Sequence, residues 1–187
     1  MTTALLQADR LSAGYEGPVV GPLSFLVSPG EVVVLSGPNG CGKSTLLGAV
    51  LGEASIFSGT LNRREGVRLA CQRQNDCLAG ELPVTGEELL ALDDASPATL
   101  PDYLQAVCRR RIDCLSGGQR QLLRVWTTLA SPARLLLLDE PTNNLDPAGE
   151  ALLADYLRAL PADRGVLLVC HEPDFVEQVA HRVIKVS

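Results

Sequence analysis

Short apolar runs recur along this chain, and a segment with apolar residues at helical spacing follows most of them. The clearest runs cover residues 32–35, 135–138 and 166–170. A run of four or five apolar residues is typical of a strand buried on both faces. Because these strands alternate with helical segments, the sequence predicts an α/β fold with a mostly parallel sheet covered on both faces.

Glycine, proline and polar residues separate the expected elements. The chain is expected to begin with an antiparallel flap, whose strands cover 5–11 and 19–27. Further strands are expected over 31–36, 59–61, 67–71, 134–139, 165–170 and 183–186, with a turn between the strands at 59–61 and 67–71. Helices are expected over 43–52, 86–92, 100–110, 118–130, 147–160 and 173–180.

The segment from about residue 73 to 116 differs from the rest of the chain. Pro83, Pro97 and Pro101 divide it into short helical patterns, which indicates a small inserted helical subdomain. A chain of 187 residues has room for one core of ordinary size. We therefore expect a single domain over 1–187, with a core formed by 1–72 and 117–187.

Composition and charge narrow the classes of function. Apolar residues make up 46% of the chain and charged residues 20%, as in soluble globular proteins. No apolar run approaches the ~18–20 residues of a membrane span, and no secretory signal is visible, so we expect a cytoplasmic location. The net charge of −6 argues against nucleic acid as a partner. The basic run Arg109-Arg110-Arg111 is interpreted as a solvated face rather than a docking patch.

The six cysteines are expected to be reduced thiols, because disulfides are rare in the cytosol. Cys71, Cys77, Cys108 and Cys114 form two C-x₅-C pairs, a spacing unlike that of familiar zinc sites. We interpret these four as small buried apolar side chains, and a metal or redox role stays open as the alternative.

A glycine-rich loop connects the apolar run over 32–35 to an apolar helix. It fits the pattern G-x-x-x-x-G-K-[ST], and its residues are Gly37, Pro38, Asn39, Gly40, Cys41, Gly42, Lys43, Ser44 and Thr45. The glycines let backbone N–H groups point into one concavity, and the helix N-terminus adds partial positive charge. In this pattern Lys43 reaches the β- and γ-phosphates and Ser44 binds Mg²⁺, so we expect the chain to bind a nucleoside triphosphate.

Two carboxylates, Asp139 and Glu140, follow the apolar run over 135–138. Neither can be buried unpaired among leucines, so both must emerge at the carboxyl end of the strand, where open α/β sheets bind ligands. We expect Asp139 to hold Mg²⁺ through its water shell and Glu140 to polarise the attacking water.

A second glycine-rich helix start lies at Leu115, Ser116, Gly117, Gly118 and Gln119, where Ser116 is a candidate N-cap. The same spacing also occurs in linkers. A second anion-binding helix terminus is redundant within one site, which indicates that this one completes the site of another subunit.

Taken together, these motifs resemble those of the ATP-binding cassette (ABC) family, in that family's order. They are the phosphate loop, 115–119, 135–140, 141–146 and 167–171. The resemblance covers nearly the whole chain and implies a P-loop NTPase fold and ATP hydrolysis. It also implies a head-to-tail homodimer, or a paired cassette, with two ATP molecules at the interface. Each ATP would contact the phosphate loop of one subunit and Ser116, Gly117, Gly118 and Gln119 of the other.

The resemblance also assigns roles to single residues. Tyr15 matches the aromatic residue that stacks on adenine. Gln72 matches the glutamine that reaches Mg²⁺, although Gln74 is close enough to compete. His171 matches the switch histidine that contacts the γ-phosphate, and Leu145-Asp146 matches the segment that crosses to the partner subunit.

As a member of this family, the chain would power transport through separate permease subunits at the cytoplasmic face of the cell membrane. The stretch between Gln72 and Ser116 is shorter than the family's usual helical subdomain, so the surface that meets a membrane partner is reduced. Residues 82–85 and 87–90 resemble a region of zinc and manganese uptake ATPases, which makes metal ions a candidate substrate.

Non-transport ABC ATPases are the alternative. Residues 143–146 have some similarity to translation factors, but those carry two cassettes in one chain. DNA-repair ATPases insert long coiled coils, for which this chain has no heptad run. A regulatory module that does not hydrolyse ATP is disfavoured by Glu140.

Overall fold

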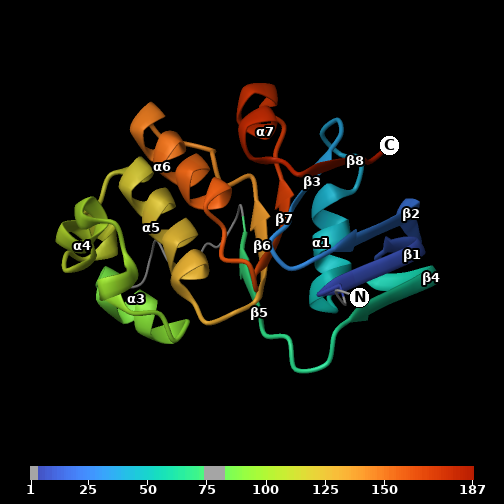
Figure 1. The fold of residues 1–187 in the computed structure, drawn as a ribbon, viewed down its shortest axis with the longest axis horizontal. Helices are drawn as coiled ribbons and strands as arrows, with labels where there is room; N and C mark the ends of the chain where they lie inside the picture. The colour runs from blue at the N-terminus through green and yellow to red at the C-terminus, as the bar shows by residue number, and fades with distance from the viewer. Residues whose placement is uncertain (1–3, 74–82) are drawn as a thin grey trace.

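A computed structural model of the chain describes residues 4–73 and 83–187. Within these residues, the core is a parallel sheet of five strands in the order β5-β6-β7-β3-β8 (Figure 1). The strands are β3 (Val32–Ser36), β5 (Leu69–Gln72), β6 (Leu135–Asp139), β7 (Gly165–Val169) and β8 (Arg182–Lys185). The predicted α/β class with a parallel core is therefore confirmed.

The expected flap is also present, as an antiparallel sheet in the order β2-β1-β4. Its strands are β1 (Leu6–Gly14), β2 (Pro18–Val27) and β4 (Ser55–Arg63). The sequence predicted only the centre of β4, because this strand is exposed at nearly every position and lacks apolar alternation. A turn separates β4 from β5 as expected, but the two strands belong to different sheets.

Helices cover both faces of the parallel sheet (Figure 1). Helix α1 (Lys43–Leu51) lies between this sheet and the flap, whereas α5 (Gly117–Ala130) and α6 (Pro147–Arg158) cover the opposite face. Helix α7 (Pro173–Val179) packs against α6. None of the helices in the described ranges is long and apolar enough to cross a bilayer.

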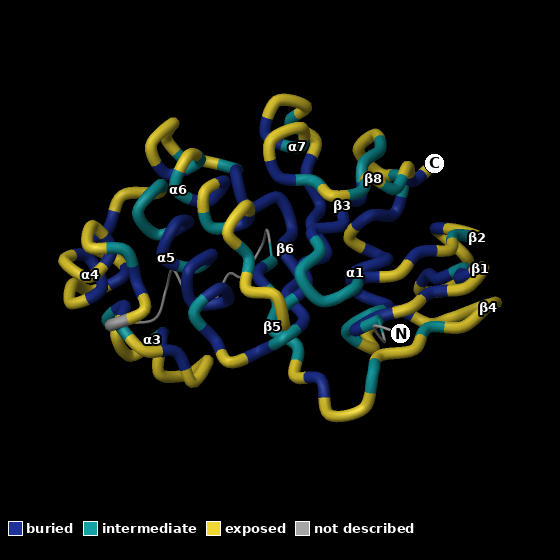
Figure 2. The backbone as a smooth tube through the Cα atoms, in the orientation of Figure 1, coloured by how far each residue is buried: buried dark blue, intermediate teal, exposed yellow. Residues whose placement is uncertain are grey.

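The side chains of the central strands alternate between two apolar cores. Val32 and Val34 enter the core on the side of α5 and α6, whereas Val33 and Leu35 enter the core on the side of α1 and the flap. Strands β6 and β7 divide in the same way. Figure 2 shows the central strands as buried along their length. Because both faces are covered, every position in these runs must be apolar.

The helical subdomain contains α3 (Gly86–Leu92) and α4 (Asp102–Cys108), which lie outside α5 (Figure 1). Helix α3 covers the predicted range. Helix α4 begins two residues later than predicted because Pro101 is its N-cap, and a proline disfavours helical backbone at the residue before it.

Candidate nucleotide-binding site

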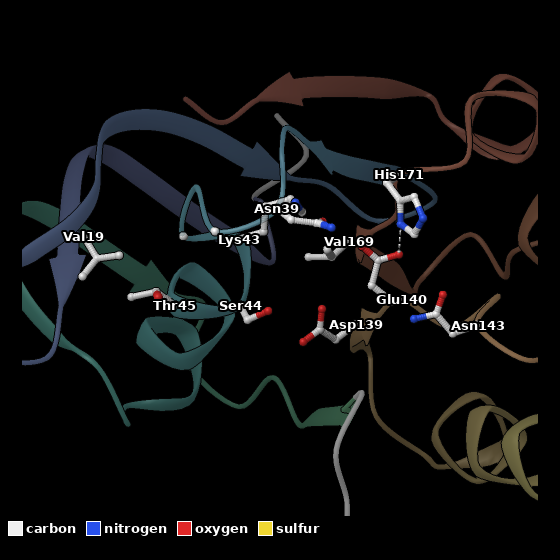
Figure 3. Close-up of a pocket in the computed structure, with 12 residues that line it drawn as sticks. Val19, Asn39, Lys43, Ser44, Thr45, Asp139, Glu140, Asn143, Val169 and His171 are labelled. Carbon is white, nitrogen blue, oxygen red and sulfur yellow. Dashed lines mark hydrogen bonds and ion pairs between the residues drawn. The ribbon is translucent and has the colours of Figure 1, made fainter.

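The carboxyl ends of three neighbouring parallel strands form the edge of the sheet where most of the predicted site residues meet. The phosphate loop follows β3, Asp139 ends β6, and His171 follows β7. A cavity of about 390 Å³ lies between them (Figure 3). It is lined by Val19, Asn39, Gly40, Gly42, Lys43, Ser44, Thr45, Asp139, Glu140, Asn143, Val169 and His171. Parallel pairing thus gathers residues that are distant in the sequence.

Two glycines give the phosphate loop a backbone conformation that other residues rarely adopt. The φ angle is 82° at Gly40 and 95° at Gly42. A Cβ atom at Gly42 would also lie 2.7 Å from the Cβ of Val20 in the flap. Gly42 is the N-cap of α1 and offers no side-chain cap, so the first N–H groups of the helix are left for an anion.

The Lys43 ammonium group is held by the loop itself. Only 7% of Lys43 is exposed, and its Nζ donates hydrogen bonds to the carbonyl oxygens of Gly37 and Pro38 at 2.8 and 2.9 Å. A buried ammonium needs such partners. Because Lys43 also lines the cavity, its charge lies where phosphate oxygens would enter.

Buried side-chain oxygens at the ends of β5 and β6 suit a hard cation. In the described part of the chain, Asp139 Oδ1 and Gln72 Oε1 are buried without a hydrogen-bond partner. Burial raises the pKa of Asp139, a hydrogen bond with Ser44 lowers it, and the neighbouring Glu140 charge raises it. Unpaired buried oxygens are costly, and Mg²⁺ prefers oxygen ligands. These residues therefore fit Mg²⁺.

Gln72 does not line the cavity. Its Nε2 donates a hydrogen bond to the Arg73 carbonyl oxygen at 2.9 Å. The competing candidate, Gln74, lies outside the described residues.

Glu140 and His171 form a direct pair at the edge of the cavity. Glu140 Oε2 lies 2.7 Å from His171 Nδ1 (Figure 3). The Glu140 side chain is buried, whereas half of the His171 side chain is exposed. Glu140 has a φ of 50°, an uncommon conformation for a residue with a side chain, and such strain is frequent at functional sites.

The Ser116–Gln119 segment lies away from the lining of the phosphate-loop cavity. Ser116 Oγ accepts a hydrogen bond from the Gln119 N–H, and Gln119 Oε1 accepts one from the Ser116 N–H, both at 3.2 Å. This capping box starts α5 and lines a separate cavity with Leu145 and Asp146. The structure therefore does not bring this segment into the phosphate-loop cavity of its own chain.

Other predicted residues also lie outside the cavity lining, and sequence reasoning missed several that form it. Tyr15 is 60% exposed, with its hydroxyl beside Gly48 of α1. The missed lining residues are Val19, Asn143 and Val169. Asn143 follows Glu140 closely, and that proximity was a usable signal. No sequence signal marked Val19, because strand pairing within the flap brings it to the cavity.

The described cysteines are free thiols. Cys108 is buried and Cys71 is half-buried, and burial raises the pKa of Cys71 to about 11. Cys114 is exposed, so the expectation of burial was wrong there, because a short turn of helix places it at the surface. Cys77 lies outside the described residues. Over 4–73 and 83–187, no group of three or more His, Cys, Asp or Glu residues could hold a metal ion.

A phosphate loop between β3 and α1, beside an acidic end of β6, defines a P-loop nucleoside triphosphatase. Comparison with known proteins narrows this class. Residues 20–143 match the family described as ABC transporter. The chain therefore belongs to the ABC transporter family, and it is an ATP-binding subunit whose ATPase activity is coupled to transport.

Several relatives align with most of this chain. The zinc import ATP-binding protein ZnuC of Paracoccus denitrificans (strain Pd 1222) is 35% identical over 98% of the chain and 76% of its own length. The protein of the same name from Cereibacter sphaeroides is 36% identical over 89% of the chain and 72% of its own length. A solved structure described as a metal-chelate type ABC transporter, in an inward-facing conformation, is 26% identical with a TM-score of 0.82. The alignment with that structure covers 99% of this chain and 80% of the other chain.

Proposed function

We propose that this chain hydrolyses ATP at a site shared with a second cassette and so drives a membrane transporter. The observation that supports the proposal most directly is the contact between Glu140 and His171, 2.7 Å apart at the edge of the phosphate-loop cavity. A carboxylate and an imidazole at that position can serve the attacking water and the γ-phosphate.

The phosphate loop and the ends of β5 and β6 would bind the substrate's phosphates and their metal ion. Lys43 and the N–H groups at the start of α1 would bind the β- and γ-phosphates. Ser44, Asp139 and Gln72 would hold Mg²⁺, which neutralises phosphate charge when it is bound. Tyr15 would stack on the adenine ring.

Glu140 and His171 would act on the reacting groups themselves. Glu140 would orient the attacking water and accept its proton, which is the role of a general base. His171 would turn from Glu140 towards the γ-phosphate, and its exposed ring has room for that rotation. Ser116, Gly117, Gly118 and Gln119 would contact the ATP bound to the partner's phosphate loop.

Closure of two cassettes on ATP would move separate permease subunits at the cytoplasmic face of the membrane. We infer that the transported substrate is a divalent metal ion and that the direction is import. Two relatives more than 30% identical are named as zinc import proteins. Residues 82–85 and 87–90 also resemble a region of zinc and manganese uptake ATPases. Cells that lose this chain should lose uptake of radioactive zinc, and the wild-type chain should restore it. Unchanged uptake would exclude zinc as the substrate.

The shared site is tested with Glu140→Gln, which keeps the shape of the side chain but removes the base. The variant should bind ATP, lose turnover by about 100-fold or more, and form a stable dimer in saturating Mg-ATP. Light scattering after gel filtration measures the mass. The matched control, Lys43→Ala with Glu140→Gln, should remain monomeric because it lacks the phosphate ligand. If Glu140→Gln alone stays monomeric in saturating Mg-ATP, the proposal is contradicted.

A further inference from the structure

A second contact joins the two loops that carry Glu140 and His171. Thr142 lies two residues after Glu140, and Glu172 directly follows His171. Thr142 Oγ1 donates a hydrogen bond to Glu172 Oε1 at 3.0 Å, and only 2% of Thr142 is exposed. Neither residue lines the phosphate-loop cavity. The loops are therefore linked twice, inside the cavity by Glu140 and His171 and outside it by Thr142 and Glu172.

The hydrogen bond between Thr142 and Glu172 has a defined direction. Its hydroxyl carries one proton, which is donated to the Glu172 carboxylate. Cys170 Sγ lies 3.9 Å from the same hydroxyl oxygen, and burial raises the pKa of Cys170. Either atom could be the donor in this long contact. The hydrogen bond to Glu172 by itself favours one orientation of the Thr142 side chain.

Glu172 does not serve the helix that it precedes. It is the N-cap of α7, and its side chain makes no capping hydrogen bond. Its carboxylate faces Thr142 instead, and it also faces Glu150 on α6. Burial, together with the Glu172 charge, raises the pKa of Glu150. A capping hydrogen bond to α7 therefore does not account for this arrangement.

We propose that Glu172 is a positioning residue for ATP hydrolysis, which acts through Thr142 to hold the His171 loop in place relative to Glu140. The inference rests on the roles proposed above for Glu140 and His171. Their direct contact must loosen when one turns to the attacking water and the other to the γ-phosphate. The bond between Thr142 and Glu172 lies outside the cavity, so it can persist throughout and keep the two loops in register.

Thr142→Val tests the link, because it keeps the size of the side chain and removes the donor. We expect kcat for ATP to fall roughly fivefold to tenfold, while KM stays within about twofold. Glu172→Ala, which removes the acceptor, should have the same effect. Thr142→Ser and Glu172→Gln keep donor and acceptor, so each should retain kcat within about twofold of the wild type. The double variant Thr142→Val/Glu172→Ala should be no slower than either single variant, because the two substitutions remove the same hydrogen bond.

Several outcomes would overturn the proposal: unchanged kcat in Thr142→Val, an equal loss in Thr142→Ser, additive losses in the double variant, or a loss confined to KM. Thermal unfolding and fluorescent ATP binding check each variant, and if Thr142→Val does not fold, the comparison of Glu172→Ala with Glu172→Gln decides. Glu140→Gln is measured in parallel. If Glu140→Gln turns over ATP at the wild-type rate, the catalytic role proposed for Glu140 is wrong. If Glu140→Gln is inactive but Thr142→Val is fully active, only the positioning role proposed for Glu172 is wrong.

Discussion

The two acidic residues that follow the apolar run of β6 have different surroundings, although they are adjacent in the sequence. Glu140 pairs with His171 at 2.7 Å. Asp139 has a hydrogen bond with Ser44 on one side, but its Oδ1 has no partner among the described residues. Burial raises the pKa of Asp139, which means that the folded protein without a cation disfavours its ionised form. The carboxylate best placed to bind a cation is thus one whose charge the protein compensates only in part.

Asp139→Asn should therefore stabilise the nucleotide-free protein at neutral pH and abolish its function. A raised carboxyl pKa in the folded state costs stability as pH rises through that pKa, and it costs nothing below the unfolded value of about 3.9. The urea midpoint of the variant should exceed that of the wild type by an amount that grows as pH rises from about 4. ATP turnover should fall at least about tenfold. A difference in midpoint that does not change with pH would contradict the argument.

At the scale of elements, backbone geometry controls how α1 begins. Gly42 has a φ of 95° and is packed against Val20 of the flap. The phosphate loop, the start of α1 and the antiparallel sheet are therefore in contact at this residue. No other residue type satisfies both constraints. The flap thus supports the phosphate loop directly, and the start of the helix depends on it.

Gly42→Ala should weaken ATP binding and destabilise the protein by about 1–3 kcal/mol, because it adds a Cβ to a left-handed backbone that is already in contact with Val20. Isothermal titration with ATP and urea unfolding measure the two effects. Gly17→Ala is the matched control, since a Cβ there would meet nothing within 4 Å and the φ angle is ordinary. Equal behaviour of the two variants would show that the contact with Val20 is unimportant.

The end of α5 depends on one side chain from a distant loop. The Arg164 guanidinium group donates hydrogen bonds to the carbonyl oxygens of Leu129, Ser131 and Ala133 at 2.5, 3.0 and 2.9 Å, and to the Tyr156 hydroxyl at 2.7 Å. Carbonyl groups at a helix C-terminus lack partners within the helix, and a cation there is favoured by the helix dipole. Arg164 therefore connects α5 and α6 to the start of β7.

Arg164→Ala should lower the free energy of unfolding by about 2–4 kcal/mol, because it leaves several part-buried acceptors without a donor. Urea denaturation measures the change. Arg158→Ala removes an exposed arginine on α6 whose ion pair is with Asp155, so it should cost less than about 0.5 kcal/mol. Equal losses in the two variants would mean that the bonds to α5 contribute nothing.

At the scale of the whole molecule, the two glycine-rich helix starts do not face the same cavity. The phosphate loop precedes α1 and Ser116 precedes α5, and each lines a cavity of its own. A complete site with both would need a second chain, placed head-to-tail so that each subunit contributes a different half.

Mixing two inactive variants tests this arrangement. Lys43→Ala removes the ammonium group that would bind the phosphates, and Ser116→Arg blocks the start of α5. In a mixed dimer, one of the two shared sites has an intact phosphate loop and an intact Ser116 segment. We expect the mixture to recover turnover up to roughly a quarter of the wild-type rate, while each variant alone stays inactive. A mixture no faster than its components would exclude a shared site.

The sequence by itself determined the local parts of this protein. The phosphate loop, the central strands and the carboxylates at the end of β6 follow from apolar periodicity and from the backbone freedom of glycine, which depend on neighbouring residues. The order of the strands, the sheet to which β4 belongs, the approach of Val19 to the cavity and the bond between Thr142 and Glu172 were decided only by the tertiary structure. These features join segments far apart along the chain, and their contacts depend on how whole elements pack, which no local pattern records.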